Sequence, residues 1–150
     1  MAGQEVSENI FLRNDLTEIE RLAKTVAEFG KRNNLSGEVM YDVRLALEEV
    51  VSNIIRYGFE DDYGHQISIQ IHLQGEILTL QIKDDGKPFN PLAVETNNIE
   101  KPFDEREEGG MGVYIVRKLM DELKYKRAEG NNVLLLRKNL AIRAANKKFW

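Results

Sequence analysis

The chain has no cysteine, only three prolines and no long apolar run. The absence of cysteine excludes disulfide bonds, thiolate metal sites and a cysteine nucleophile. No stretch approaches the roughly 18 apolar residues of a membrane-spanning helix, and residues 1–9 lack the apolar segment of a secretion signal. We therefore expect a cytoplasmic protein that does not enter a membrane.

Basic residues are also too few for a nucleic-acid-binding surface. Lysine and arginine number 21 against 25 aspartates and glutamates, which gives a net charge of −4, and no long basic run is present. We therefore expect no direct contact with nucleic acid. The 150 residues, 42% of them hydrophobic, suit one globular domain over residues 1–150, with a core at about 10–138 and a tail at 139–150.

Apolar residues at helical spacing predict two helices in the first part of the chain. Asp15 has the position of an N-cap, with Glu18 as its capping-box partner, and the first helix is expected to end at Gly30. Ser36 has the position of the second N-cap, and the second apolar stripe ends near Gly58.

Period-two alternation predicts strands in the rest of the chain. The expected strands are residues 9–13, 67–73, 78–82, 125–129 and 133–137, with turns at Gln74-Gly75 and Gly130-Asn131. Residues 83–110 read as a long loop, and a third helix is expected at about 112–123. The pattern predicts an α+β fold, a two-layer sandwich whose mixed, mostly antiparallel sheet has helices on one face.

Glu49 and Asn53 are the first candidate site residues. Four positions apart on a helix, they share a face at the rim of the apolar stripe, whereas Glu48 lies about 140° away from Asn53. A carboxylate and an amide at such a rim need a partner, and a hard metal ion bound through oxygen is one. An ordinary salt-bridged helix edge is the alternative.

Asp84 is the second candidate, at the end of an expected strand. It shares the parity of the apolar residues before it, so its carboxylate should face the helices while Asp85 points outward. A buried carboxylate needs donors, and an adenine amino group is a suitable one. Gly86 would allow the backbone to approach a ligand closely. A plain Asp-Asp-Gly turn is the alternative.

The third candidate is the glycine-rich segment that leads into the expected third helix. Gly110, Met111 and Gly112 would place backbone N–H groups and the helix dipole against an anion such as phosphate. The alternative is a flexible linker before a helix. His65 and His72 are expected at the surface, without a metal.

In this order and spacing, the three segments resemble those of the Bergerat-fold ATPases, also called the GHKL group. Glu49 to Asn53 resembles the N box, Asp84-x-Gly86 the adenine-recognising box, and Gly110-x-Gly112 the glycine box. Within that group, the runs at 47–58, 84–91 and 109–121 are similar to those of the anti-sigma-factor serine/threonine kinases.

The resemblance implies ATP and Mg²⁺ as cofactors and transfer of phosphate to a serine or threonine of a partner. Glu49 would be the general base, Asn53 would hold Mg²⁺, Asp84 would accept from adenine, and residues 110–112 would donate to phosphate. The implied partners are a STAS-type anti-sigma-factor antagonist, a sigma factor and a second copy of the chain.

Two features depart from the family pattern. Tyr57 stands where a histidine commonly follows the asparagine of the N box, and the expected lid at 92–109 has only Lys101 and Arg106 as basic residues. Two alternatives therefore stay open. One is a module that binds a partner in a nucleotide-dependent way without phosphate transfer, and the other is an unrelated structural α/β domain.

Overall fold

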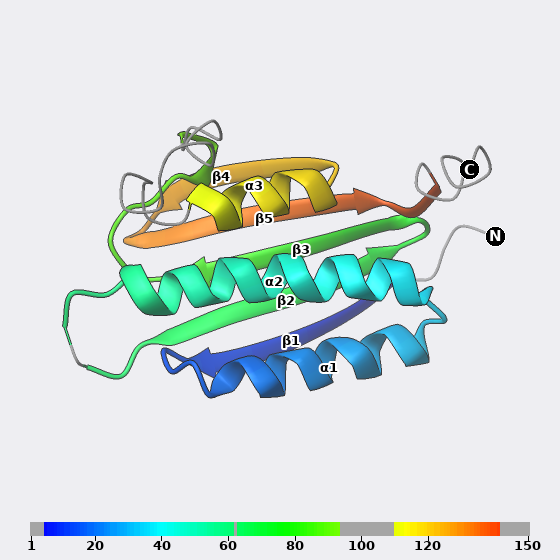
Figure 1. Cartoon of the computed structure of the whole chain (residues 1–150), viewed down its shortest axis with the longest axis horizontal. Coiled ribbons are helices and arrows are strands. Elements are labelled where there is room, and N and C mark those ends of the chain that lie inside the picture. The colour runs from blue at the N-terminus through cyan, green and yellow to red at the C-terminus, as the bar shows by residue number, and fades with distance from the viewer. Residues whose placement is uncertain (1–4, 62, 94–109, 142–150) are drawn as a thin grey trace.

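A five-stranded sheet forms one layer of the structure, and three α-helices cover one face of it (Figure 1). The structure is a computed structural model that describes residues 5–61, 63–93 and 110–141. In chain order the elements are β1 (Glu5–Arg13), α1 (Glu18–Arg32), α2 (Gly37–Tyr57), β2 (Gln66–Gln74), β3 (Ile77–Asp84), the 3-10 helix η1 (Pro91–Ala93), α3 (Gly110–Leu119), β4 (Glu122–Ala128) and β5 (Asn131–Asn139).

The strand order is β1-β2-β3-β5-β4, and each neighbouring pair is antiparallel. The expected α+β two-layer sandwich with helices on one face is therefore confirmed. The sheet is wholly antiparallel in the described residues, where the sequence had suggested a mixed one. After β3 the chain forms η1, α3 and the edge strand β4, and β5 then pairs between β3 and β4.

Alternation along the strands builds the core. On β3, the inward-facing Leu78, Leu80 and Ile82 are at most 1% exposed. Thr79 and Gln81 lie between them and face the side of the sheet that no helix covers. The same alternation holds on β2. The helices contribute the other half of the core through Leu22, Phe29 and further apolar residues of α1 and α2. Burial of the apolar side chains therefore determines which residues at the end of each strand face the helices.

The start of α1 corrects the expected capping box. The helix begins at Glu18, and the carboxylate of Asp15 instead accepts from the backbone N–H of Thr17 at 2.9 Å. The Glu18 carboxylate accepts from the backbone N–H of Arg13 at 3.0 Å and from the Arg21 guanidinium at 2.6 Å. Glu18 is therefore hydrogen-bonded to the end of β1, and this tertiary bond replaces the expected capping-box bond within the helix start.

The end of α1 differs from the prediction, whereas the start of α2 agrees with it. Helix α1 continues past Gly30 to Arg32, because Gly30 provides room for the side chain of Met40 on α2. Asn34 then adopts a left-handed conformation with φ of 56°. Ser36 caps α2 as expected, accepting from the N–H of Val39 at 3.2 Å.

The later elements are also shifted relative to the expectation. Helix α3 ends at Leu119, not near residue 123, because the chain from Glu122 pairs with β5. The turn of the last hairpin is Glu129-Gly130, where both residues have positive φ, as a tight two-residue turn requires. The expected tail at 139–150 begins inside β5, and residues 142–150 lie outside the described part.

No α-helix among the described residues is both long and apolar enough to cross a bilayer.

A buried ion pair joins the sheet to two helices. Lys138 shares the inward parity of Leu134 and Leu136 on β5, and its Nζ lies 3.2 Å from Asp42 Oδ2 on α2. The same Nζ donates to the carbonyl of Leu119 at the end of α3, at 2.6 Å. The side chains of both partners are at most 5% exposed. One ammonium group therefore fixes α2 and α3 over the same strand.

We expect Lys138→Met to destabilise the fold strongly, because it leaves the Asp42 carboxylate buried without its cation. Removing one partner of a buried pair costs about 3–5 kcal/mol, while replacing both partners by apolar residues is often neutral. Chemical unfolding should therefore show a large loss for Lys138→Met and recovery in the double variant with Asp42→Leu. Equal stability of Lys138→Met and the wild type would contradict this role.

Candidate functional site

A cavity opens between the carboxyl ends of α2 and β3, the start of β5 and the first turns of α3. Its walls are mostly apolar, with polar groups at a few places. The lining residues are Val50, Asn53, Ile54, Tyr57, Gly58, Ile82, Asp84, Lys87, Phe89, Pro91, Gly112, Val113, Val116, Leu123, Tyr125, Asn132 and Leu134. An apolar cavity with a few converging polar groups is the usual form of a small-molecule site.

Asp84 lines this cavity and faces the helices, as the parity of β3 predicts. The residue is 4% exposed, while Asp85 is exposed. Asp84 Oδ1 accepts from the N–H of Gly86 at 2.9 Å and from Asn132 Nδ2 at 3.1 Å. Burial raises the pKa of this carboxyl above its ordinary value, against the lowering effect of the two hydrogen bonds. Within the described residues both bonds reach Oδ1, which leaves Oδ2 to accept from a ligand.

Asn132 holds the Asp84 carboxylate in place, although no sequence motif predicted this role. It is the register partner of Asp84 across β3 and β5, and its amide makes three more hydrogen bonds. Nδ2 donates to the carbonyl of Lys87 at 3.0 Å, and Oδ1 accepts from the N–H of Phe89 at 3.2 Å and the hydroxyl of Tyr125 at 2.6 Å. An amide at an inward position of a strand is the sequence signal that could have found it.

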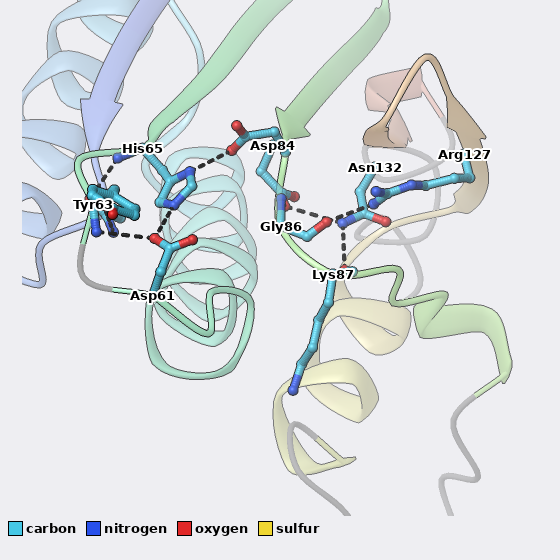
Figure 2. A network of polar contacts seen from close by, with 10 residues as sticks. Asp61, Tyr63, His65, Asp84, Gly86, Lys87, Arg127 and Asn132 are labelled. Carbon is cyan, nitrogen blue, oxygen red and sulfur yellow. Dashed lines mark hydrogen bonds and ion pairs between the residues drawn. The ribbon is translucent and has the colours of Figure 1, made fainter.

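The loop after β3 is held against the end of α2. The N–H of Lys87 donates to the carbonyl of Gly58 at 2.8 Å. A Cβ on Gly86 would lie 2.5 Å from that same carbonyl oxygen, so only glycine fits there. Arg127 Nη1 donates to the carbonyl of Gly86 at 2.7 Å from β4 (Figure 2). The adenine-box loop therefore has a fixed backbone, supported from both sides.

Glu49, Asn53 and Gly112 meet where α2 passes the start of α3. A Cβ on Gly112 would lie 2.9 Å from both Glu49 Oε2 and Asn53 Nδ2. The two side chains therefore share one face of α2, as their spacing predicts. Glu48 faces elsewhere, and its carboxylate oxygens lie 3.2 Å and 3.3 Å from Arg44 Nη1.

The first residues of α3 bring the glycine box to the same place. Gly110 and Met111 form the first turn of the helix, and Gly112 lines the cavity beside Asn53. Early N–H groups of a helix lack partners inside the helix and favour an anion. Asn53 and Glu49 supply the oxygen atoms that Mg²⁺ prefers, and a site with few protein ligands suits an ion that shares its shell with water and phosphate.

Lys87 is a cation at the cavity wall that no pattern in the sequence singled out. Tyr57, the position that departs from the family pattern, also lines the cavity. The lid residues Lys101 and Arg106 lie outside the described residues. The site thus combines a buried carboxylate, apolar walls, and side-chain oxygen atoms beside the start of a helix.

Comparison with known sequences places this arrangement in a family. Residues 12–138 match the family described as the histidine kinase-like ATPase domain. A serine-protein kinase RsbW of Bacillus mycoides (strain KBAB4) is 29% identical over 115 residues, which cover 74% of this chain and 71% of that protein. The serine-protein kinase RsbW of Bacillus cereus (strain AH187) is similar to the same degree.

Solved structures show the same fold. A crystal structure of RsbU and RsbW domains from Mycobacterium tuberculosis superposes with a TM-score of 0.67 at 15% identity, covering 90% of this chain and 32% of that chain. The histidine kinase domain of a blue-light activated kinase from Erythrobacter litoralis gives 0.57 at 19% identity, covering 87% of this chain and 63% of that chain.

The family match spans most of the chain, and the structure brings the N box, adenine box and glycine box together around one cavity. The chain belongs to the histidine kinase-like ATPase domains, the ATP-binding GHKL group, and within it resembles the RsbW serine-protein kinases.

Proposed function

We propose that this protein binds ATP with Mg²⁺ and phosphorylates a serine or threonine of a regulatory partner. The observation that carries the proposal is that Asp84, Asn53 and Gly112 all line one cavity. The resemblance to serine-protein kinases supplies the reaction class.

The adenine base would enter the apolar part of the cavity. Asp84 Oδ2 is free to accept from the exocyclic amino group, and Asn132 holds Oδ1 so that the carboxylate keeps one orientation. Ile82 and Leu134 on neighbouring strands offer apolar surface for the faces of the base. A buried site of this kind rejects ligands that lack the matching donor, since Asp84 would then lose a hydrogen bond.

The phosphates would lie between α2 and the start of α3. Asn53 would hold Mg²⁺ through its side-chain oxygen, and the first N–H groups of α3 would donate to phosphate oxygens. Mg²⁺, when bound, supplies charge neutralisation on the phosphates. The absence of a side chain on Gly112 leaves the space that this arrangement needs, since a Cβ would meet both Asn53 and Glu49.

Glu49 would act as the general base. A serine or threonine hydroxyl oxygen of the partner attacks the γ-phosphorus, its proton passes to Glu49, and the bond to ADP breaks as ADP leaves. Such transfer depends on positioning and charge stabilisation more than on covalent help from the protein. Asn53, on the same face and one helical turn away, would keep the metal beside the reacting group.

The proposed partners follow from the resemblance to anti-sigma-factor kinases. They are a STAS-type antagonist as phosphate acceptor, a sigma factor as a second binding partner, and another copy of this chain as a dimer partner. Residues 1–150 are proposed to act as one kinase-like domain.

A second candidate is a module that binds its partner in a nucleotide-dependent way without transferring phosphate. Tyr57 favours it, because a tyrosine lines the cavity where the family commonly has a histidine. Assay of phosphate transfer to a STAS protein, alongside nucleotide titration, separates the two candidates.

Asp84→Asn should weaken adenine nucleotide binding by about ten- to a hundredfold. The amide is a poorer acceptor, and losing a hydrogen bond to a charged group costs roughly 1.5–3 kcal/mol. Calorimetric titration with ADP measures the effect. Asp15→Asn, in the exposed turn before α1, is the matched charge control and should bind like the wild type. Unchanged affinity in Asp84→Asn would refute the anchor.

Asn53→Ala should reduce the contribution of Mg²⁺ to ATP affinity more than it reduces metal-free binding. Mg²⁺ takes few protein ligands, so one missing oxygen matters. ATP titrations with and without Mg²⁺ test this, and Asn53→Asp, which retains an oxygen ligand, should keep the metal effect. A metal effect of wild-type size in Asn53→Ala would make Asn53 structural only.

Glu49→Gln should leave ATP binding nearly intact and lower phosphate transfer by about 10²–10⁴-fold, the usual worth of a general base. The glutamine keeps the size of the side chain but accepts no proton. Glu48→Gln is the control, since Glu48 is occupied by Arg44. The rate of phosphate incorporation into a STAS protein is the measurement. Wild-type rates in both variants would exclude this mechanism.

A further inference from the structure

His65 lies between two carboxylates, next to the proposed nucleotide site. Its Nε2 lies 2.6 Å from Asp61 Oδ1, and its Nδ1 lies 3.0 Å from Asp85 Oδ1 (Figure 2). Asp61 belongs to the loop that leaves α2, and Asp85 follows the adenine anchor Asp84 directly in the chain. One imidazole therefore connects the loop between α2 and β2 to the loop after β3.

The surroundings hold the imidazole in place. Its ring stacks on the ring of Phe59, with centroids 4.2 Å apart and planes 11° from parallel. The backbone N–H of His65 donates to Asn14 Oδ1 at 3.1 Å, and the N–H of Asn14 donates to the carbonyl of His65 at 3.2 Å. The side chain is 16% exposed, so it lies at the surface and is largely covered by its neighbours. The ring has little freedom to leave the two carboxylates.

The geometry favours a charged ring. A neutral imidazole has one N–H, but a carboxylate oxygen faces each ring nitrogen here, and only the imidazolium donates at both. The hydrogen bond that the ring donates to Asp61, followed by the one it donates to Asp85, raises the pKa of His65 above its ordinary value. Among the described residues, the charged groups that act on the ring are these two carboxylates, and the residue after β1 is the neutral Asn14.

Asp85 connects the ring to ligand binding. Asp85 is exposed and immediately follows Asp84, whose pKa it raises through its negative charge. A cation on His65 offsets that charge and fixes the backbone at Asp85. The next residue, Gly86, donates its N–H to Asp84 and is already held by Arg127. His65 thus adds a third support to this loop, through the side chain of Asp85.

We propose that His65 is a positioning residue for the nucleotide site, an imidazolium that bridges Asp61 and Asp85 and thereby raises nucleotide affinity. This inference rests on the proposed nucleotide binding. His65 touches no ligand itself and acts through the loop after β3.

The bridge makes nucleotide affinity depend on pH in one direction. The folded pKa of His65 is raised, so the charged bridge is complete below the ordinary value of about 6.5 and is lost as pH rises through the raised pKa. The pKa of Asp61 is lowered by its bond to His65, so this carboxylate stays ionised over that range. Affinity should therefore fall on the alkaline side.

Titration of Mg²⁺-ADP between about pH 6 and 9 tests the proposal. Wild-type affinity should fall roughly two- to fivefold across the range, as expected for a partly exposed ion pair. His65→Gln should bind at the weaker level throughout, and Asp85→Asn should also lose the pH dependence. His72→Gln, on β2 and paired with Glu5, is the matched control and should behave like the wild type. Because all these variants keep Asp84, the difference between their profiles isolates the bridge.

An NMR titration of the imidazole provides a readout that needs no nucleotide. The pKa of His65 should be above about 6.5 in the wild type and should fall in both Asp61→Asn and Asp85→Asn. A displaced pKa without any nucleotide binding would refute the proposed function while leaving the bridge intact. Nucleotide binding with the same pH profile in wild type and His65→Gln would overturn the positioning role.

Discussion

The carboxylate of Asp84 ends a strand whose other inward-facing residues are leucine and isoleucine, and burying it costs free energy unless donors surround it. Asn132 meets this requirement from the adjacent strand. The same amide also donates to the carbonyl of Lys87 and accepts from the N–H of Phe89 and the hydroxyl of Tyr125. The need to satisfy one buried charge therefore shapes the loop after β3 and the floor of the cavity.

At two glycines, segments of the chain pass close to one another, and this brings the rest of the site near Asp84. Gly86 allows the loop after β3 to pass the end of α2 at Gly58, and Gly112 allows α3 to pass the side chains of Glu49 and Asn53. Larger residues at either glycine would separate the elements that carry the functional groups. The two glycines therefore allow the close approach that brings the functional groups together.

The sequence predicted those features that depend on periodicity. The inward direction of Asp84 followed from the parity of its strand, and the shared face of Glu49 and Asn53 followed from helical spacing. Features that depend on contacts across the fold were missed. Asn132 lies 48 positions from Asp84, and His65 lies 20 positions from Asp85, so only strand pairing and loop packing bring them together. The two ends of α1 and the end of α3 were mispredicted for the same reason, whereas both ends of α2 were predicted correctly.

Two kinds of polar contact thus hold the site, and they should respond differently to solvent. The pair of Lys138 and Asp42 is buried and joins β5 to the helices that carry the N box and glycine box. The bridge of His65 is partly open to water, since the side chains of Asp61 and Asp85 are about half exposed. Salt acts mainly on exposed charges, because buried pairs are screened much less. A change of pH acts on the bridge through the raised pKa of His65. We therefore expect a change of salt or pH to alter the loop beside Asp84 while the helices stay in place.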